Sequence, residues 1–235
     1  MSSEEKLTEA PLMSHLLELR TRLLRAVICV FILAIPCLYF SNTLFEVLSA
    51  PLVAKLPADG QLIGTSVTSG FMAPFKLAIF VAVFLSVPYT LYQAWAFVAP
   101  GLYRSEKRFA IPLLISSVVL FVVGIVFAYT LVFPAMFTFF AQTTPAGVAM
   151  MTDISSYLDF AMVMFLAFGI AFELPVVVML LVLTGIVSVA ALKQNRAYVL
   201  LGIFVIAALL TPADALSLCM MAVPMYLLYE AGLLV

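Results

Sequence analysis

Residues 109–140 read FAIPLLISSVVLFVVGIVFAYTLVFPAMFTFF and contain no charged side chain. A helix needs about 20 apolar residues to cross the hydrocarbon core of a bilayer, so this stretch predicts a membrane span that emerges in part from the membrane. The rest of the chain is similar, because 66% of its 235 residues are hydrophobic and 10% are charged. Soluble domains carry about 25% charged residues. We therefore expect an all-α, polytopic membrane protein.

Six hydrophobic segments predict six transmembrane helices. Besides 109–140, they cover residues 23–40, 77–98, 160–183, 197–210 and 215–229. The fifth and sixth are expected to be short, because charged residues and Pro212 limit their ends. At 1.5 Å per residue they reach only about 21–23 Å. Either the membrane thins around them, or their flanking residues insert and snorkel.

Positively charged side chains are unevenly distributed over the predicted loops. Nine lie in the N-terminal segment and in the second and fourth loops, whereas only Lys55 and Lys76 lie on the other side. Loops rich in Lys and Arg stay in the cytoplasm, so both termini are expected on the cytoplasmic side of the inner membrane. The nine are Lys6, Arg20, Arg22, Arg25, Arg104, Lys107, Arg108, Lys193 and Arg196.

The predicted organisation is a single integral membrane domain over residues 1–235. Within it, residues 1–22 form a cytoplasmic amphipathic N-terminal segment, and residues 41–75 form a periplasmic loop. Three prolines and three glycines in that loop are typical of an ordered cap of short helices and turns. The sequence shows no internal repeat, which disfavours an inverted-repeat transporter.

Two acidic residues on the predicted cytoplasmic side are candidates for binding a cation. Glu18, Arg22 and Arg25 share one face of a helix, and Glu18 precedes Arg22 in the favourable i,i+4 order. That pattern equally suits an amphipathic helix lying at the membrane interface. Glu106 is the only acid among three bases in the second loop, either a solvated acid or a carboxylate held for an incoming cation.

Polar residues inside the hydrophobic segments form a second set of candidates. Glu173 lies mid-way along the fourth segment, where a charge costs about 2.5–3.5 kcal/mol on insertion scales. We expect it to face the protein interior or a wet cavity, or to be protonated; a hydrogen-bonded packing carboxyl is the alternative. Thr211 and Asp214 lie in the turn before the sixth segment, where Asp214 is a candidate N-cap.

Sequence motifs for enzymatic chemistry are missing. The only histidine, His15, precedes the first span, and there is no HExxH, phosphate loop or pair of intramembrane aspartates. Cys29, Cys37 and Cys219 all lie in apolar runs without metal-ligand spacing. We expect no catalysis, cofactor, metal site or disulfide.

Four stretches, taken in their order and spacing, resemble the TatC family, the core subunits of the twin-arginine protein translocase. They are SHLLELRTRLL (14–24), PYTLYQAWAFVAPGLYRSEKR (88–108), AFGIAFELPV (167–176) and LLTPADALSLCMMAVPMYLLYE (209–230). The resemblance covers essentially the whole chain. It implies a receptor that binds twin-arginine signal peptides of folded precursors on the cytoplasmic face. It also implies single-span TatA and TatB partners, several copies of the chain in one complex, and use of the protonmotive force.

The resemblance also implies roles for individual residues. Glu18 and Glu106 match the family's signal-binding carboxylates, and Arg20 and Phe97 match residues around the same site. The remaining matches are the intramembrane glutamate Glu173, the loop proline Pro51, and Thr211 and Asp214 in the region where partner helices dock.

One position departs from the family pattern. Some relatives carry Gln four residues after the position of Asp214, where this chain has Leu218, so a polar partner site here would have to use Thr211 or other groups. Two other functions stay open. One is a proton-coupled secondary transporter of a small solute that uses Glu173, and the other is a structural assembly subunit. Membrane lipid is an expected partner and nucleic acid is not.

Overall fold

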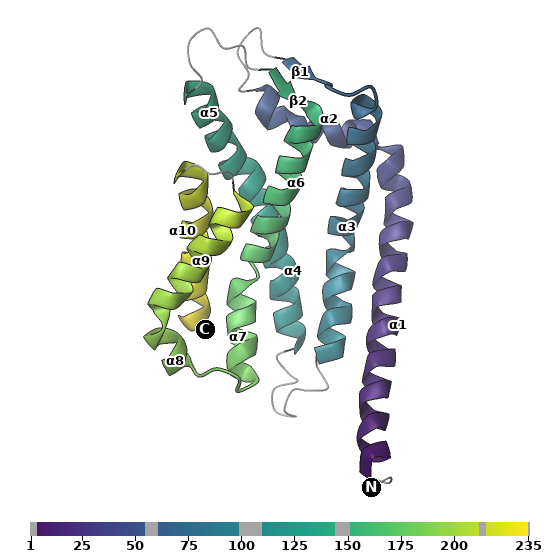
Figure 1. Cartoon of the computed structure of the whole chain (residues 1–235), viewed down its shortest axis with the longest axis vertical. Coiled ribbons are helices and arrows are strands. Elements are labelled where there is room, and N and C mark those ends of the chain that lie inside the picture. The colour runs from purple at the N-terminus through teal and green to yellow at the C-terminus, as the bar shows by residue number, and fades with distance from the viewer. Residues whose placement is uncertain (1–3, 55–60, 99–109, 144–150, 212–214, 235) are drawn as a thin grey trace.

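The computed structural model describes residues 4–54, 61–98, 110–143, 151–211 and 215–234. The chain forms a bundle of long helices with a small sheet at one end (Figure 1). Five segments are long and apolar enough to cross a membrane, which identifies a multi-pass membrane protein. They are Leu16–Tyr39, Ser69–Phe97, Ile111–Thr143, Ile154–Leu183 and Ala215–Leu233.

The described elements follow one another in a simple order. They are α1 (Glu4–Tyr39), α2 (Ser41–Val53), β1 (Gln61–Ile63), α3 (Ser69–Val98), α4 (Ala110–Phe127), η3 (Ala128–Val132), α5 (Phe133–Thr143), β2 (Met151–Asp153), α6 (Ile154–Ala171), α7 (Leu174–Leu183), α8 (Val189–Gln194), α9 (Arg196–Leu210) and α10 (Ala215–Leu234). The N-terminus and α8 lie toward one end of the bundle, opposite the sheet (Figure 1).

Small side chains bring α1 and α3 together. Ala34 and Cys37 of α1 pack against Ala78 and Ala82 of α3, and all four are buried. Small residues allow such close approach between membrane helices. The remaining surface of α1 is largely apolar and exposed, as at Phe31, and the helix lies at the edge of the bundle beside α3 (Figure 1). That surface suits contact with lipid.

The third long segment is continuous through α4, η3 and α5. η3 is a five-residue π-helical turn, and the N–H of Phe133 bonds to the carbonyl of Ala128 at its end. Phe133 is fully buried, with its ring centroid 5.0 Å from that of Phe165 in α6. Gly124 permits the close approach of α4 to α6, because a Cβ there would lie 2.6 Å from the carbonyl oxygen of Phe168.

The fourth long segment is interrupted between α6 and α7. The N–H of Glu173 bonds to the carbonyl of Ile170 at 3.0 Å, which is a tighter turn than the α-helical pattern. Pro175 follows at the start of α7, where its missing N–H is tolerated because the first turn of a helix leaves its N–H groups unpaired. The break therefore falls at the intramembrane glutamate.

The end of the bundle opposite the N-terminus is covered by α2 and a two-stranded sheet. β1 and β2 pair in parallel, with Gln61 opposite Met151 and Ile63 opposite Asp153. Asp153 also accepts a 2.9 Å hydrogen bond from the hydroxyl of Thr65. The helical prediction is thus confirmed for the bulk of the described chain, but the all-α prediction missed this short sheet.

Two predicted helix lengths need correction. α9 has 15 residues and is short, as expected. α10 has 20 residues and extends beyond Glu230, because that carboxylate bonds to Arg196 at 2.7 Å and to the hydroxyl of Tyr226 at 2.9 Å. α1 is one unbroken helix from residue 4 to residue 39, so the face with Glu18, Arg22 and Arg25 belongs to this long helix rather than to a separate surface helix.

Candidate functional site

The first polar cluster joins α1 to α3. Glu18 Oε1 accepts hydrogen bonds from Arg22 Nε at 2.9 Å and from Arg22 Nη2 at 2.5 Å. The remaining terminal nitrogen of Arg22, Nη1, donates to Gln93 Oε1 in α3 at 3.3 Å. The i,i+4 pair predicted from the sequence is therefore confirmed. Gln93, buried within the packed helices, connects it to the bundle.

The cluster leaves part of the Glu18 carboxylate accessible. The Glu18 side chain is 38% exposed, compared with 20% for Arg22. Both contacts from Arg22 go to Oε1, and Oε2 has no hydrogen-bond partner among the residues that the structure describes. A carboxylate can accept on both oxygens, so Oε2 is free to take a second cationic donor.

Two other residues predicted at this site lie on α1 and α3. Arg20 is exposed on α1, and it does not share a helix face with Glu18 because it is only two residues away. Phe97 is half-buried and follows Gln93 by four positions in α3, so the two share one face of that helix. Glu106 lies outside the described residues. The structure thus brings Glu18 to the face of α3 that carries Phe97.

The second polar cluster lies inside the bundle at the break between α6 and α7. Ser117 of α4 is buried and donates to Glu173 Oε2 at 2.5 Å. Glu173 Oε1 is also buried, and it has no partner in the described part of the chain. A buried polar atom without a partner is costly. This site can therefore accept one further hydrogen bond.

Three predicted residues lie elsewhere. Pro51 is inside α2. Thr211 is buried and donates to its own backbone, to the carbonyl of Ala207 at 2.8 Å. Asp214 lies outside the described residues, so its predicted capping role is not tested. The hydroxyl of Thr211 is already used as a donor, which leaves it only as an acceptor for another helix.

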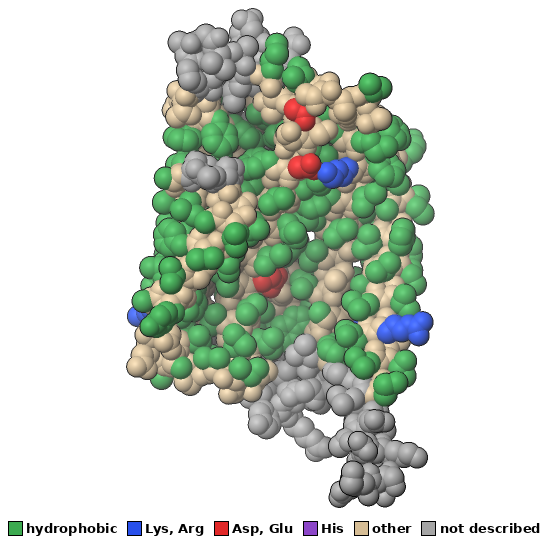
Figure 2. Space-filling view, in the orientation of Figure 1, with side chains coloured by type: hydrophobic (Ala, Val, Ile, Leu, Met, Phe, Trp, Pro, Cys, Tyr) green, Lys and Arg blue, Asp and Glu red, His purple; other side chains and the backbone are tan. Residues whose placement is uncertain are grey.

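Sequence reasoning missed Gln93 and Ser117. Each is a polar residue in a largely apolar helix, and that pattern was the available signal. Their contacts span 71 and 56 residues along the chain, so helix periodicity could not indicate them. Lys76 was assigned to a loop, but it lies in α3 and is paired with Asp159 of α6. Figure 2 shows that hydrophobic side chains dominate the face in view and that few charged side chains lie among them.

An apolar groove lies between α3 and α4, with α2 and α6 at its margins. Its volume is about 590 Å³. The two hydroxyls in its lining, of Tyr129 and Thr130, both donate to backbone carbonyls, of Val47 and Val126 respectively. The groove therefore presents hydrocarbon rather than hydrogen-bond donors to whatever occupies it.

The chain is similar to known proteins over most of its length. A sequence model of the family "Sec-independent protein translocase protein (TatC)" matches residues 14–224. The protein of that name from Haemophilus influenzae is 52% identical over 225 residues, covering 96% of this chain and 88% of the relative. The Escherichia coli K12 protein is 49% identical over 222 residues, covering 94% and 86%. A crystal structure of a twin-arginine translocase receptor, TatC, is similar with a TM-score of 0.81 at 36% identity, covering 94% of this chain and 96% of the other.

Proposed function

Since the chain belongs to the TatC family of Sec-independent protein translocase proteins, we propose that it is the receptor of a twin-arginine translocase. In this role it binds the twin-arginine signal peptide of a folded precursor on the cytoplasmic face. With TatA and TatB it then moves the precursor across the bacterial inner membrane, driven by the protonmotive force. The chain itself performs no catalysis.

The Glu18 carboxylate is the observation that carries this proposal. Arg22 holds one of its oxygens, and the other oxygen is available for a guanidinium from outside. The contact with Arg22 supports the proposal, because it is the same carboxylate–guanidinium pairing that a signal arginine would make. Glu106 is proposed as the second acceptor, so that the two carboxylates receive the two arginines.

Charge alone cannot make this binding tight. An exposed ion pair contributes only about 0.2–1 kcal/mol. The apolar stretch of the signal peptide must therefore bury surface against the spans, and Phe97 near the end of α3 is proposed as part of that contact. The two carboxylates then mainly discriminate, because Lys lacks the planar fork with which Arg bonds a carboxylate.

The proposed topology has six spans with both termini in the cytoplasm. The five long segments supply five crossings, and the 15-residue α9 supplies the sixth. α2 and β1 then form the ordered periplasmic part of loop 41–75, and residues 1–22 are cytoplasmic. Arg20 and its basic neighbours on α1 would contact anionic lipid headgroups, worth about 1 kcal/mol per charge.

Partner helices are proposed to dock on α9 and α10 near Thr211. α9 is only about 22 Å long at 1.5 Å per residue. Its polar end near Thr211 would therefore lie within the depth of the membrane, where a neighbouring single-span helix can contact it. Disulfide scanning over positions 209–215 should trap TatB or TatA. If no position gives an adduct while the protein remains folded, the docking surface lies elsewhere.

Precursor binding to the detergent-solubilised complex at several salt concentrations tests the receptor role. Glu106→Gln should weaken binding of a twin-arginine precursor, and Glu106→Arg should weaken it further through repulsion. Glu46→Arg is the matched control, because Glu46 is exposed in α2, at the end of the bundle opposite the N-terminus. Wild-type binding by Glu106→Arg in an assembled complex would rule out the proposed site.

A further inference from the structure

Pro51 leaves one carbonyl of α2 without its helical partner. In an α-helix the carbonyl of residue i accepts from the N–H of residue i+4. Pro51 lies inside α2 and has no N–H, so the carbonyl of Val47 lacks that donor. The next carbonyl, of Leu48, retains Leu52 as its potential helical donor.

Tyrosine hydroxyls from two other elements approach these two carbonyls. Tyr129 of η3 donates to the carbonyl of Val47 at 2.7 Å. Tyr157 of α6 donates to the carbonyl of Leu48 at 2.6 Å, and its side chain is only 3% exposed. The donor lost at Pro51 is therefore replaced by a donor from the π-helical turn, 82 residues away along the chain.

We propose that Pro51 and Tyr129 act as a matched pair that fixes α2 on the bundle. Pro51 exposes the Val47 carbonyl, and the Tyr129 hydroxyl binds it. Tyr157 is a second, independent contact, because the Leu48 carbonyl can accept from two donors at once. Val47, Leu48 and Tyr129 also line the apolar groove, so this contact sets the position of α2 at the margin of the groove.

The π-helical turn is part of the same device. It places the Tyr129 ring against Phe165 of α6, with the ring centroids 6.5 Å apart, while the hydroxyl points to α2. Single π-helical turns inside α-helices are frequent at functional sites. Both halves of the pair thus depart from ordinary helix geometry, one by a missing N–H and the other by a π-turn.

A double-mutant cycle tests the pairing. Pro51→Ala restores an N–H to the helix, and Tyr129→Phe removes only the hydroxyl. Tyr129→Phe should lower the folding equilibrium constant about three- to ten-fold in the natural chain, measured by SDS-driven unfolding in mixed micelles. It should cost much less in the Pro51→Ala background, because the restored N–H then donates to the Val47 carbonyl. Tyr157→Phe is the matched control and should add fully to Pro51→Ala.

A backbone ester separates the missing N–H from the rigidity of the proline ring. Cell-free synthesis can place lactic acid at position 51, which has the side chain of alanine but no N–H. In this Pro51→lactic acid background Tyr129→Phe should cost as much as in the natural chain, whereas in the Pro51→Ala background it should cost much less. The same ester at Ala50 removes an ordinary helix donor and should destabilise the protein.

Two results would overturn the proposal. One is full additivity of Pro51→Ala and Tyr129→Phe, and the other is an ester at position 51 in which Tyr129→Phe costs as little as it does in Pro51→Ala. Transport of a twin-arginine precursor is scored separately, because its link to α2 rests on the proposed function. The substitutions at positions 51 and 129 could be coupled in unfolding while the unmodified chain and its partners transport no precursor. That result would count against the proposed function but would support the Pro51–Tyr129 pairing.

Discussion

Ser117 Oγ donates a 2.5 Å hydrogen bond to Glu173 Oε2, and this bond connects α4 to the break between α6 and α7. The two residues lie in different membrane segments, and Glu173 Oε1 beside the bond is buried without a partner in the described chain. The contact holds the carboxyl group in one orientation, which leaves its second oxygen available for a water molecule or a ligand group.

Removing the Ser117 hydroxyl should destabilise the bundle. Ser117→Ala leaves both Glu173 oxygens without partners, at a cost of about 1–3 kcal/mol in the free energy of unfolding. Ser116→Ala is the control, because Ser116 donates only to the carbonyl of Leu113 in its own helix. SDS-driven unfolding should separate the two, and equal losses would show that the Ser117–Glu173 bond contributes nothing specific.

Substitutions at Glu173 distinguish a functional carboxyl from a packing one. Glu173→Gln keeps an acceptor for Ser117 and should assemble normally, whereas Glu173→Arg should impair insertion or function because it places a cation in the bundle. Glu173→Leu should slow precursor transport while the protein remains folded. Wild-type transport rates in Glu173→Leu would show that Glu173 contributes only to packing.

Arg22 should compete with a signal arginine for Glu18. Arg22→Gln removes the internal guanidinium, so the Glu18 carboxylate becomes fully available and precursor binding should tighten by up to about five-fold. Arg25→Gln removes the same charge one turn away, where Arg25 is exposed, and should change binding less. Weaker binding in Arg22→Gln alone would instead indicate that Arg22 positions the carboxylate for the ligand.

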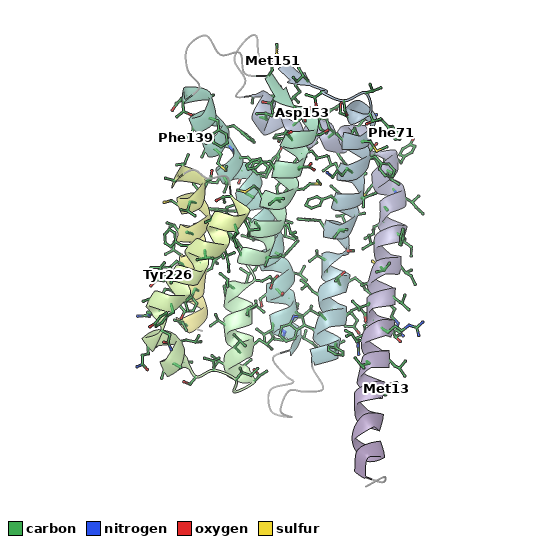
Figure 3. All side chains as sticks on the ribbon, in the orientation of Figure 1. Met13, Phe71, Phe139, Met151, Asp153 and Tyr226 are labelled. Carbon is green, nitrogen blue, oxygen red and sulfur yellow. The ribbon has the colours of Figure 1, made fainter. Side chains whose placement is uncertain are left out.

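Acid should weaken the attachment of residue 65 to the start of α6. Asp153, at the sheet end of the bundle (Figure 3), accepts from the backbone N–H of Ser156 and from Thr65, and these bonds lower its pKa from 3.8 to about 2. A lowered carboxyl pKa contributes stability above the unfolded value, which is lost as the pH falls from about 4 to 2.

Thermal unfolding in detergent from pH 2 to pH 6 measures this contribution. The difference in midpoint between the natural chain and Asp153→Asn should be present at pH 6 and shrink toward pH 2. Thr65→Val removes one of the donors and should give a smaller difference with the same sign. A difference that does not vary with pH would show that the charge of Asp153 does not stabilise this end of the bundle.

Single cysteines test the proposed orientation. Cysteines at Ala58 and Ala146 should react with an impermeant reagent from the periplasm, because the basic residues are concentrated on the opposite side. Cysteines at Ser105 and Gln194 should react only after permeabilisation. Labelling at Ser105 in intact cells would reverse the assigned topology.

Regularities within one helix were predictable from the sequence. The charge-free stretch at 109–140 predicted a long helical segment, because only helices satisfy their backbone in lipid without neighbouring strands. The Glu18–Arg22 pair was predictable because the helical repeat places residues four apart on one face. The short α9 followed from Arg196 and Pro212 at its limits.

Contacts between helices were not predictable in this way. Nothing in the spacing of the chain indicates that Gln93 meets Arg22, or that Tyr129 meets Val47. The length of α10 was wrong for the same reason, since the charge of Glu230 ends a helix only where no partner such as Arg196 compensates it. Glu106 and Asp214 lie outside the described residues, so their proposed roles remain predictions.

The π-helical turn η3 makes the packing of the third span depend on the number of residues in the turn. It contains one residue more than an α-helical turn would use, so the two halves of the span are out of phase by about 100°. Phe133, Met136 and Phe137 are buried in this phase. Deletion of one residue within 128–132 would restore an ordinary helix and rotate the side chains of Phe133, Met136 and Phe137 away from the core. Gaps at this point of an alignment therefore mark a repacked interface, whereas substitutions at the same positions leave the phase unchanged.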